Sequence, residues 1–581
     1  MPKKLNNQEL ITILKEVLAA MEIRDSDFFR VRAYQNAISA IENSTFSVYD
    51  LWEKGRVQEI PGVGPALTQH IGDLFEKGAV GEFERLKKDL PDGMFALIGI
   101  QGIGAKKAYK LANAFDLTSR DNALEKVAIF AEKGLIRDLP GFGEKSEKLI
   151  LDAISEAKKT KKEKPRILWA RADEVVQRIY KYMEACDKVE KIEALGSYRR
   201  KKETVGDLDI ATSTGSENEV MAHFLKFPEI KEVLVQGDKK ASVVLGNDLQ
   251  VDFRTILPNQ YGSMAQYFTG SKYHNISLRT HALEKGLSVS EYGIKKGDKL
   301  YEFTDETDFY GFLGLPYIPP EIRQGKEEVA LAADDKLPKL VEPSDIKGDL
   351  HAHTIFSDGG NTLEEMVRGA EERGYSYIGI TDHAPSIVSR GREEIKKIVQ
   401  DTKLKIDELN EENPAIKVLY GYEVNILADA TIGFPDELME KLDFVIAGIH
   451  TSFNQDRKTV MKRLFSAVRH PLVTIIAHPS ARLLGVREPL DIDWMVFFEE
   501  VKKYHKILEI NSQPERLDLP YDLVKEAKKS GIKFIISSDA HSVDSLDYMR
   551  FGVSVARRGW CASSDIINTL PTKDFLRVLC K

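Results

Sequence analysis

The pattern of apolar and polar positions divides the chain into regions with different predicted secondary structure. Residues 1–160 consist of short helical stretches joined by glycine turns, and residues 33–41 have the apolar spacing of a helix. A Gly-x-Gly turn recurs within residues 60–64, 100–104 and 139–143, and an amphipathic helical stretch follows each copy. Because the copies are spaced by about 40 residues, this region is predicted to contain a repeated supersecondary unit.

The middle of the chain has a mixed pattern. Between residue 165 and residue 270 helical stretches alternate with strand-like runs, of which 204–212 and 249–256 are the clearest. Residues 271–325 form a smaller mixed unit. The polar and charged stretch 326–345 is expected to be the main linker between domains.

After residue 346 short apolar strands end in polar residues, and helical stretches separate them. This alternation of strands and helices is typical of a β/α barrel, in which the functional residues lie at the C-terminal ends of the strands. The predicted strands are 377–383, 418–423, 444–450, 473–478, 507–511 and 534–539.

Composition favours a soluble protein with several domains. A chain of 581 residues is too long for one hydrophobic core. It has no run of about 18 apolar residues that could span a membrane, and its first residues lack the apolar core of a signal peptide. The three cysteines are too far apart to indicate a disulfide framework or a zinc–thiolate site, which predicts a reducing, cytoplasmic environment. They are Cys186, Cys561 and Cys580.

The net charge of −8 argues against a uniformly basic surface for nucleic acid, but the charge is unevenly distributed. Residues 101–200 contain 22 basic and 16 acidic side chains, a net charge of +6. A surface that binds a nucleic-acid backbone is therefore expected to be local, and salt should weaken its binding steeply.

The glycine turns are candidates for contact with DNA. A Gly-x-Gly turn that opens a helix presents backbone N–H groups to a phosphate, with no side chain in the way. The three copies resemble helix-hairpin-helix elements, which bind DNA backbones without reading the sequence. The alternative is a packed helical repeat with solvated lysines, and this alternative is strongest for the third turn. The candidate DNA-binding residues are Gly62, Gly64, Gly102, Gly104, Lys106 and Lys107.

Three aspartates form a candidate metal site. Asp207 and Asp209 lie two residues apart in a strand-like run, so their carboxylates point to the same face. Asp252 comes from the next candidate strand. Such a set can share two divalent ions for in-line phosphoryl transfer, and Mg²⁺ suits an all-carboxylate site. The alternative is a solvated Asp-x-Asp at a strand end.

The motifs Gly-Ser-Tyr-Arg-Arg at 196–200, Gly-Asp-Leu-Asp at 206–209 and Tyr-Phe-Thr-Gly-Ser at 267–271 resemble family X DNA polymerases. The resemblance runs from residue 29 to about residue 320. It implies that Asp207, Asp209 and Asp252 are the catalytic metal ligands. It also implies that the triphosphate is bound by Gly196, Ser197, Arg200 and Gly206. The sugar would be lined by Tyr267, Phe268 and Gly270, and Tyr267 would disfavour a 2′-hydroxyl. Asn275 would face the incoming base, and Arg279 would face the template.

The chain departs from the family pattern at two positions. Val205 stands where the family often has a polar residue before the glycine of the Gly-Asp pair, so one triphosphate contact is expected to be missing. His70 stands where members with lyase activity carry a Schiff-base lysine. Because imidazole cannot form the imine, lyase activity of that kind is not expected.

The last region carries six histidines and three carboxylates at or beside predicted strand ends. A lone histidine is usually a satisfied polar residue, but a set of this size suits Zn²⁺, Mn²⁺ or Fe²⁺, with two or three ions. Such clusters activate water and bind phosphate for hydrolysis. His470 and His505 are expected to be structural. The candidate ligands are His351, His353, Asp358, His383, Glu423, His450, His478, Asp539 and His541.

This pattern resembles the PHP (polymerase and histidinol phosphatase) domain. The resemblance implies one ion on His351, His353, Glu423 and Asp539, a second on Glu423, His450 and His478, and a third on Asp358, His383 and His541. Because every expected ligand is present, the domain is predicted to be active, with Mn²⁺ or Zn²⁺ bound. Arg482 and Lys462 are either phosphate ligands or solvated charges.

Together the two resemblances match the bacterial and archaeal PolX type of family X polymerase. They imply short-gap filling in DNA repair on gapped or primed DNA with dNTPs, 3′→5′ exonuclease and related 3′-end hydrolysis, cleavage at abasic sites, and a monomer with two independent metal sites. The rival is a DNA-binding module joined to a small-molecule phosphatase. The expected domains are helical regions at 1–90 and 91–164, an α/β nucleotidyltransferase palm at 165–270, an α+β thumb at 271–325, a linker at 326–345 and a distorted TIM-like PHP barrel at 346–581.

Overall fold

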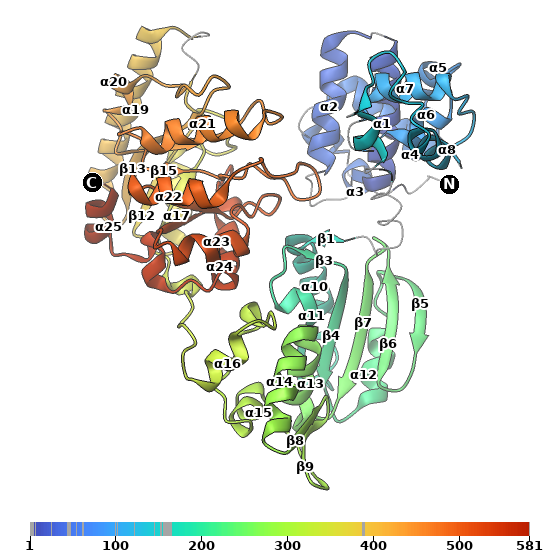
Figure 1. Cartoon of the computed structure of the whole chain (residues 1–581), viewed down its shortest axis with the longest axis vertical. Helices are drawn as coiled ribbons and strands as arrows, with labels where there is room; N and C mark the ends of the chain where they lie inside the picture. Colours follow the sequence, from blue (N-terminus) through green and yellow to red (C-terminus); the bar gives the residue numbers. More distant parts are fainter. Residues whose placement is uncertain are drawn as a thin grey trace. The chain divides into compact units, whose positions relative to one another are not determined.

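The chain forms two units, Met1–Pro165 and Arg166–Lys581, which are described separately (Figure 1). No helix in the described part is both long and apolar enough to cross a membrane. The computed structural model describes residues 5, 7–24, 26–42, 48–53, 55–60, 63–98, 100, 103–120, 122–144, 146–151, 154, 166–385 and 390–579.

The first unit is helical and has two apolar cores. One core gathers Leu10, Val17 and Phe75, and the other gathers Met94 and Leu111, so the change from one core to the other falls near residue 90. The helices of the first core are α1 (Asn7–Ile23), α2 (Phe28–Glu42), α3 (Val48–Glu53), α4 (Pro65–Lys77) and α5 (Gly81–Lys87), and those of the second include α6 (Gly93–Leu97), α7 (Ala105–Ala114) and α8 (Ala123–Glu132).

The palm, the first part of the second unit, is built on a five-stranded sheet with the order β2-β4-β7-β6-β5. The central pair, β4 (Asp207–Ser213) and β7 (Gln250–Ile256), is parallel, and every other pair is antiparallel. The predicted run 204–212 is divided at Gly206 into β3 (Thr204–Val205) and β4. The remaining elements are β1 (Ile167–Leu168), α10 (Trp169–Met183), β2 (Lys191–Ala194), α11 (Gly196–Arg199), α12 (Glu217–Phe224), β5 (Ile230–Gln236) and β6 (Lys240–Leu245).

The thumb follows the palm and combines helices with a small antiparallel sheet of order β10-β9-β8. Its core contains Leu278, Phe309 and Tyr310. The predicted linker 326–345 packs on this core through Leu340 and contains a short helix of its own, α16 (Glu328–Ala333). Helix α13 (Tyr261–Thr269) still belongs to the palm, on which it packs through Tyr261, Met264 and Ala265. The thumb elements are α14 (Lys272–Glu284), β8 (Leu287–Ser290), β9 (Gly293–Lys296), β10 (Lys299–Tyr301) and α15 (Glu306–Phe312).

The last part is a parallel barrel of seven strands in sequential order, and a bridge between Ala352 and Ala540 brings its first and last strands together. Helices between the strands surround it. The strands are β11 (Gly348–Ala352), β12 (Tyr377–Ile380), β13 (Lys417–Asn425), β14 (Phe444–Gly448), β15 (Ile475–Ile476), β16 (Ile507–Asn511) and β17 (Phe534–Ser537), and the helices include α17 (Leu363–Glu372), α19 (Arg392–Glu412), α20 (Asp436–Met439), α21 (Arg457–Arg469), α22 (Trp494–Lys503), α23 (Tyr521–Lys529), α24 (Met549–Arg558) and α25 (Thr572–Leu579).

The two ends of the barrel differ in polarity. An apolar cluster that includes Leu350, Phe444 and Ile535 packs with Phe575 of α25. The polar residues of the strands therefore gather toward the C-terminal ends. The predicted strands 473–478 and 534–539 end earlier than expected, at Ile476 and Ser537, and the residues His478 and Asp539 beyond them have left-handed φ angles of 28° and 54° that a strand cannot adopt.

Candidate active sites

The three palm aspartates lie on two adjacent strands. Asp209 of β4 is the register partner of Asp252 of β7, and Asp207 precedes Asp209 by two residues on the same face. Gly196 has a φ of 57°, and a side chain at this position would collide with the Asp209 carboxylate. The turn at Gly196 can therefore approach the aspartates this closely only with a glycine.

The electrostatics of this cluster suit a divalent cation. Burial raises the pKa of Asp209 to about 6, and the charges of Asp207 and Asp252 add to the effect. Burial also acts to raise the pKa of Asp252, but hydrogen bonds from Gln250 and Ser242 and the nearby Lys240 outweigh it and lower the pKa. Three oxygen-donor side chains that repel one another are the donor set that Mg²⁺ prefers.

The predicted triphosphate residues surround the aspartates. Ser197 lies in α11, and Arg200 directly follows that helix. The Arg200 side chain donates to the carbonyl of Thr269, at the end of α13. Burial lowers the pKa of Arg200 to about 10, and Arg558 adds to the effect. At Gly206 an added Cβ would lie 3.0 Å from Arg166 Nη1, the end of a flexible and exposed side chain.

The predicted sugar and base residues lie where α13 meets α14. The rings of Tyr267 and Phe268 meet edge to face with centroids 5.2 Å apart, and Arg254 lies 4.1 Å from the Phe268 ring centroid. Asn275 Nδ2 donates to the Tyr267 carbonyl over 2.7 Å. Arg279 is exposed and donates to the Asn275 carbonyl over 3.1 Å. Gly270, with a φ of 64°, makes the turn between the two helices.

The predicted DNA-binding glycines are only partly described. Gly62 and Gly102 lie outside the described residues. Gly64 and Gly104 directly precede α4 and α7, and among the described residues other than the chain neighbours no atom lies within 4 Å of a Cβ built at either position. Lys106 and Lys107 lie in the first turn of α7.

His70 is held by hydrogen bonds at the position of the absent lyase lysine. Its Nδ1 lies 2.9 Å from the Tyr34 hydroxyl, and its Nε2 lies 3.2 Å from Glu82 Oε2. Glu82 is also paired with Arg30. Both imidazole nitrogens are thus engaged, and no amine occupies this position.

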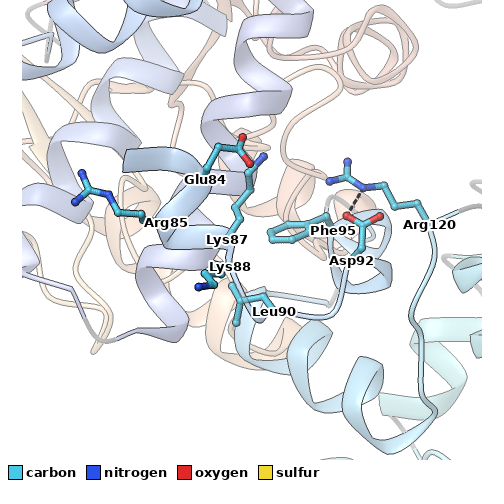
Figure 2. Close-up of a pocket in the computed structure, with 8 residues that line it drawn as sticks. All are labelled: Glu84, Arg85, Lys87, Lys88, Leu90, Asp92, Phe95 and Arg120. Carbon is cyan, nitrogen blue, oxygen red and sulfur yellow. Dashed lines mark hydrogen bonds and ion pairs between the residues drawn. The ribbon is translucent and has the colours of Figure 1, made fainter. Parts of the chain in front are cut away.

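Figure 2 shows a pocket of about 450 Å³ in the first unit, lined mainly by charged side chains. Arg120 and Asp92 face each other there at 2.8 Å, and Arg120 is also paired with Glu16 of α1. Lys87 lies 3.4 Å from the same Glu16. Arg120 and Lys87 are thus already paired with carboxylates, and Arg120 links the second helical core to the first through Glu16.

The predicted histidine ligands converge at the C-terminal ends of the barrel strands. The ligand atoms within each of three groups lie within 4.8 Å of one another. Eight of the nine predicted ligands fall in these groups. The ninth, His478, lies beside them, with its Nε2 2.8 Å from Glu423 Oε1. The groups are His353, Asp358, His383 and His541; His351, His353 and Asp539; and His383, Glu423 and His450.

Two buried Nε2 atoms of this centre have no hydrogen-bond partner among the described residues. They are His351 Nε2 and His353 Nε2, which lie 3.4 and 3.3 Å from Asp539 Oδ1. A buried polar atom without a partner is costly, and both atoms face the same carboxylate oxygen. A cation between these three side chains would satisfy all of them, so the residues fit a bound metal.

The carboxylates and imidazoles of the cluster shift one another's pKa values toward the charged forms. Burial acts to raise the pKa of Glu423, but the neighbouring histidines, His450 and His351 first, lower it well below its usual range. Burial likewise acts to lower the pKa of His383, but Asp358 and Glu423 raise it to about 10. Because metal ligands must be deprotonated, cations would compete with these protons.

Comparisons with known proteins match separate parts of the chain. Family models match residues 5–80 (helix-hairpin-helix domain), 95–156 (SAM-like helix-hairpin-helix tandem), 264–324 (DNA polymerase beta thumb) and 349–513 (PHP domain). The DNA polymerase/3′-5′ exonuclease PolX of Bacillus subtilis (strain 168) is 35% identical over 574 residues, which cover 98% of each chain. The chain belongs to the PolX family. This result confirms the resemblance and the fold class predicted from the motifs.

The PHP part of this PolX-family chain also matches separate barrels. A probable phosphatase of Thermoanaerobacter sp. (strain X514) is 30% identical over 236 residues, which cover 38% of this chain and 89% of the phosphatase. A probable phosphatase of Caldanaerobacter subterraneus is 31% identical over 204 residues, which cover 33% of this chain and 75% of that protein.

Two residues that support the PolX histidine centre were missed by reasoning from the sequence. Glu509 Oε1 lies 2.6 Å from His351 Nδ1, and its other oxygen accepts a hydrogen bond from the backbone N–H of His478. Asn511 donates to Asp539 Oδ2 over 3.0 Å. Such partners orient metal ligands. The sequence did contain a sign of their role. Both are polar residues two positions apart in the otherwise apolar strand β16, so their side chains point to the same face.

Arg482, considered above as a phosphate ligand, has a different role in this PolX chain. It is buried, donates to the carbonyls of Arg516 and Leu517, and is paired with Glu203 of the palm at 2.7 Å. Its charge is therefore used within the protein. Lys462 lies on α21 with its Nζ 3.5 Å from the Asp429 carbonyl.

Proposed function

We propose that this chain is a DNA polymerase that fills short gaps and also hydrolyses 3′-terminal nucleotides from DNA. The observation that carries the proposal is the register of β4 and β7, which sets Asp209 beside Asp252 with Asp207 on the same face. The Bacillus subtilis relative is named for both activities. We propose gapped or primed DNA and dNTPs as substrates, and a monomer as the working form.

In the polymerase site, Mg²⁺ ions held by Asp207, Asp209 and Asp252 would activate the primer hydroxyl and neutralise the triphosphate. Ser197 and the Arg200 guanidinium would bind the phosphates. The Tyr267 ring would crowd a ribose 2′-hydroxyl and so favour dNTPs. Asn275 and Arg279, on one helix, would face the base pair, and the helices that follow Gly64 and Gly104 would hold the DNA backbone.

In the barrel, two or three Mn²⁺ or Zn²⁺ ions would supply an activated water and bind the scissile phosphate. Glu423 lies within 2.9 Å of nitrogens of His383, His450 and His478, so its two oxygens could hold more than one ion. Glu509 would hold His351 through its Nδ1 and so direct its Nε2 toward the metal. These roles support hydrolysis of a phosphodiester at a DNA end, including a 3′ end beside an abasic site.

A cavity of about 290 Å³ beside His383 supports a nucleotide as the substrate of the barrel. His383 and Asp382 belong to its wall, together with the buried Tyr420 and Tyr422. Phe356, also in the wall, is 51% exposed and offers its ring for stacking. We propose that the terminal nucleoside lies in this cavity while its phosphate reaches the metal cluster, because aromatic rings bind unpaired bases by stacking.

The Phe356→Ala change should therefore lower kcat/KM for 3′-nucleotide removal by about tenfold, since stacking is worth roughly 1–3 kcal/mol per base. Hydrolysis of bis(p-nitrophenyl) phosphate, which has no base, should change by less than about twofold. Met495→Ala, which removes another exposed apolar side chain from the barrel, serves as the control. Equal losses on both substrates would argue against the base-binding cavity.

The rival function is hydrolysis of a small phosphate ester, and the probable phosphatases matched by the barrel are the observation that favours it. The test is incubation of the full chain with a 5′-labelled gapped duplex, with and without dNTPs, in Mg²⁺, Mn²⁺ or a chelator. We expect the primer to lengthen to the end of the gap with dNTPs and to shorten without them, and the chelator should stop both reactions. A chain that hydrolysed histidinol phosphate but left the primer unchanged would favour the rival.

A further inference from the structure

Helix α24 of the barrel contacts the polymerase half of the second unit. Arg557 is paired with Glu321 of the thumb at 2.8 Å and with Glu342 at 2.6 Å. On the palm side the Phe551 ring packs edge to face on Trp169, with centroids 5.2 Å apart. The helix therefore joins the barrel to both the palm and the thumb.

Arg558, at the end of α24, donates through Nη1 to the backbone carbonyl of Arg200. It is 3% exposed, and its guanidinium lies 4.2 Å from the centroid of the Tyr521 ring, which fixes the plane of the group. Gln324 donates to the Arg558 carbonyl over 3.3 Å. A buried arginine from the barrel thus holds the backbone of a residue assigned to the triphosphate.

Two more barrel arginines reach the same stretch, Gly196–Gly206, here called the nucleotide loop. Arg550 is paired with Asp173 at 2.7 Å, and Asp173 accepts a hydrogen bond from the Tyr198 hydroxyl. Arg482 is paired with Glu203 at 2.7 Å. The barrel therefore contacts the nucleotide loop directly at Arg200 and Glu203, and reaches Tyr198 through Asp173.

We propose that Arg558 is a positioning residue for dNTP binding, and that the barrel thereby presets the nucleotide loop for the triphosphate. The inference rests on the proposed polymerase function. A loop that is ordered before its ligand arrives binds more tightly, because less conformational freedom is lost on binding. Hydrogen bonds from a charged donor are about twice as strong as neutral ones, and the contact falls on Arg200 itself.

The inference is tested with Arg558→Ala in the full chain, by single-nucleotide gap filling. We expect KM for the dNTP to rise about tenfold, kcat to stay within about twofold, and removal of nucleotides from single-stranded 3′ ends to be unchanged. Arg558→Lys should recover part of the loss, because an ammonium can still donate to the Arg200 carbonyl. Arg577→Ala, an exposed arginine on α25, is the matched control.

A double-mutant cycle separates positioning from general support of the fold. If Arg558 acts through Arg200, the Arg200→Ala/Arg558→Ala double variant should bind dNTP no more weakly than Arg200→Ala alone. Additive losses, an unchanged KM, or equal loss of exonuclease activity would overturn the inference. If Arg558→Ala does not fold, the test uses Glu203→Gln, which weakens the ion pair between the same loop and Arg482. This variant should raise KM for the dNTP and leave kcat unchanged. An unchanged KM for the dNTP would overturn the inference. Failure of the unaltered chain to extend primers would instead contradict the proposed polymerase function.

Discussion

The Asp252→Ala variant is expected to lose nucleotide addition by about a thousandfold or more while binding gapped DNA with nearly unchanged affinity. Asp252 is the register partner of Asp209, so its removal takes away one side of the shared carboxylate set. Loss of a ligand weakens the cations that stabilise the charge developing on the transferred phosphate. Primer extension under single-turnover conditions measures the loss, and a gel-shift titration measures DNA affinity.

Asp187→Ala is a suitable control for this experiment, because Asp187 belongs to the palm and its side chain is 85% exposed. The control should extend primers like the unaltered chain. The Asp252 variant should also retain nuclease activity on single-stranded 3′ ends, since the histidine ligands belong to the barrel. Near-normal extension by Asp252→Ala would show that the palm carboxylates are not the catalytic set.

The His351→Ala variant is expected to lower 3′-end hydrolysis by about a thousandfold and to leave gap filling within about twofold of the unaltered chain. His351 Nε2 is one of the buried nitrogens without a partner, and it faces Asp539 in the metal-suited cluster. Its loss removes a ligand and leaves the Glu509 carboxylate without its imidazole partner. Release of labelled mononucleotide in Mn²⁺ and bound metal per chain are the two measurements.

His505→Asn provides the comparison, because His505 is exposed and its left-handed φ of 54° is tolerated by asparagine. This variant should keep both its metal content and its nuclease activity. Full nuclease activity in contaminant-free His351→Ala would mean that the histidine cluster has a structural role instead.

The parts of the molecule that could be predicted depend on local rules. Alternation along a strand places Asp207 and Asp209 on one face, and a run of apolar strands with polar ends predicts a barrel with its site at one end. The predicted strand 473–478 is reduced to Ile475–Ile476, because strand propensity cannot reveal the left-handed backbone at His478.

The joint between barrel and palm could not be predicted from the sequence. Arg482 and Glu203 are 279 residues apart, and Arg558 and Arg200 are 358 residues apart, so no local pattern relates them. The sequence predicted two independent sites on either side of a linker. The two candidate ligand sets belong to different sheets, but Arg558 of the barrel contacts the backbone of Arg200, so the two parts are in contact although they share no candidate ligand.

The apolar core shared by palm and barrel bears on how the halves can be separated in the laboratory. Trp169, Val205 and Phe551 belong to one continuous buried cluster. A barrel expressed alone would expose Phe551 to water and leave Arg558 without its acceptor, and such surfaces promote aggregation. If a separately expressed barrel proved insoluble, the cause would be that the truncation divides a shared hydrophobic core. Its insolubility would not show that the active site is inactive.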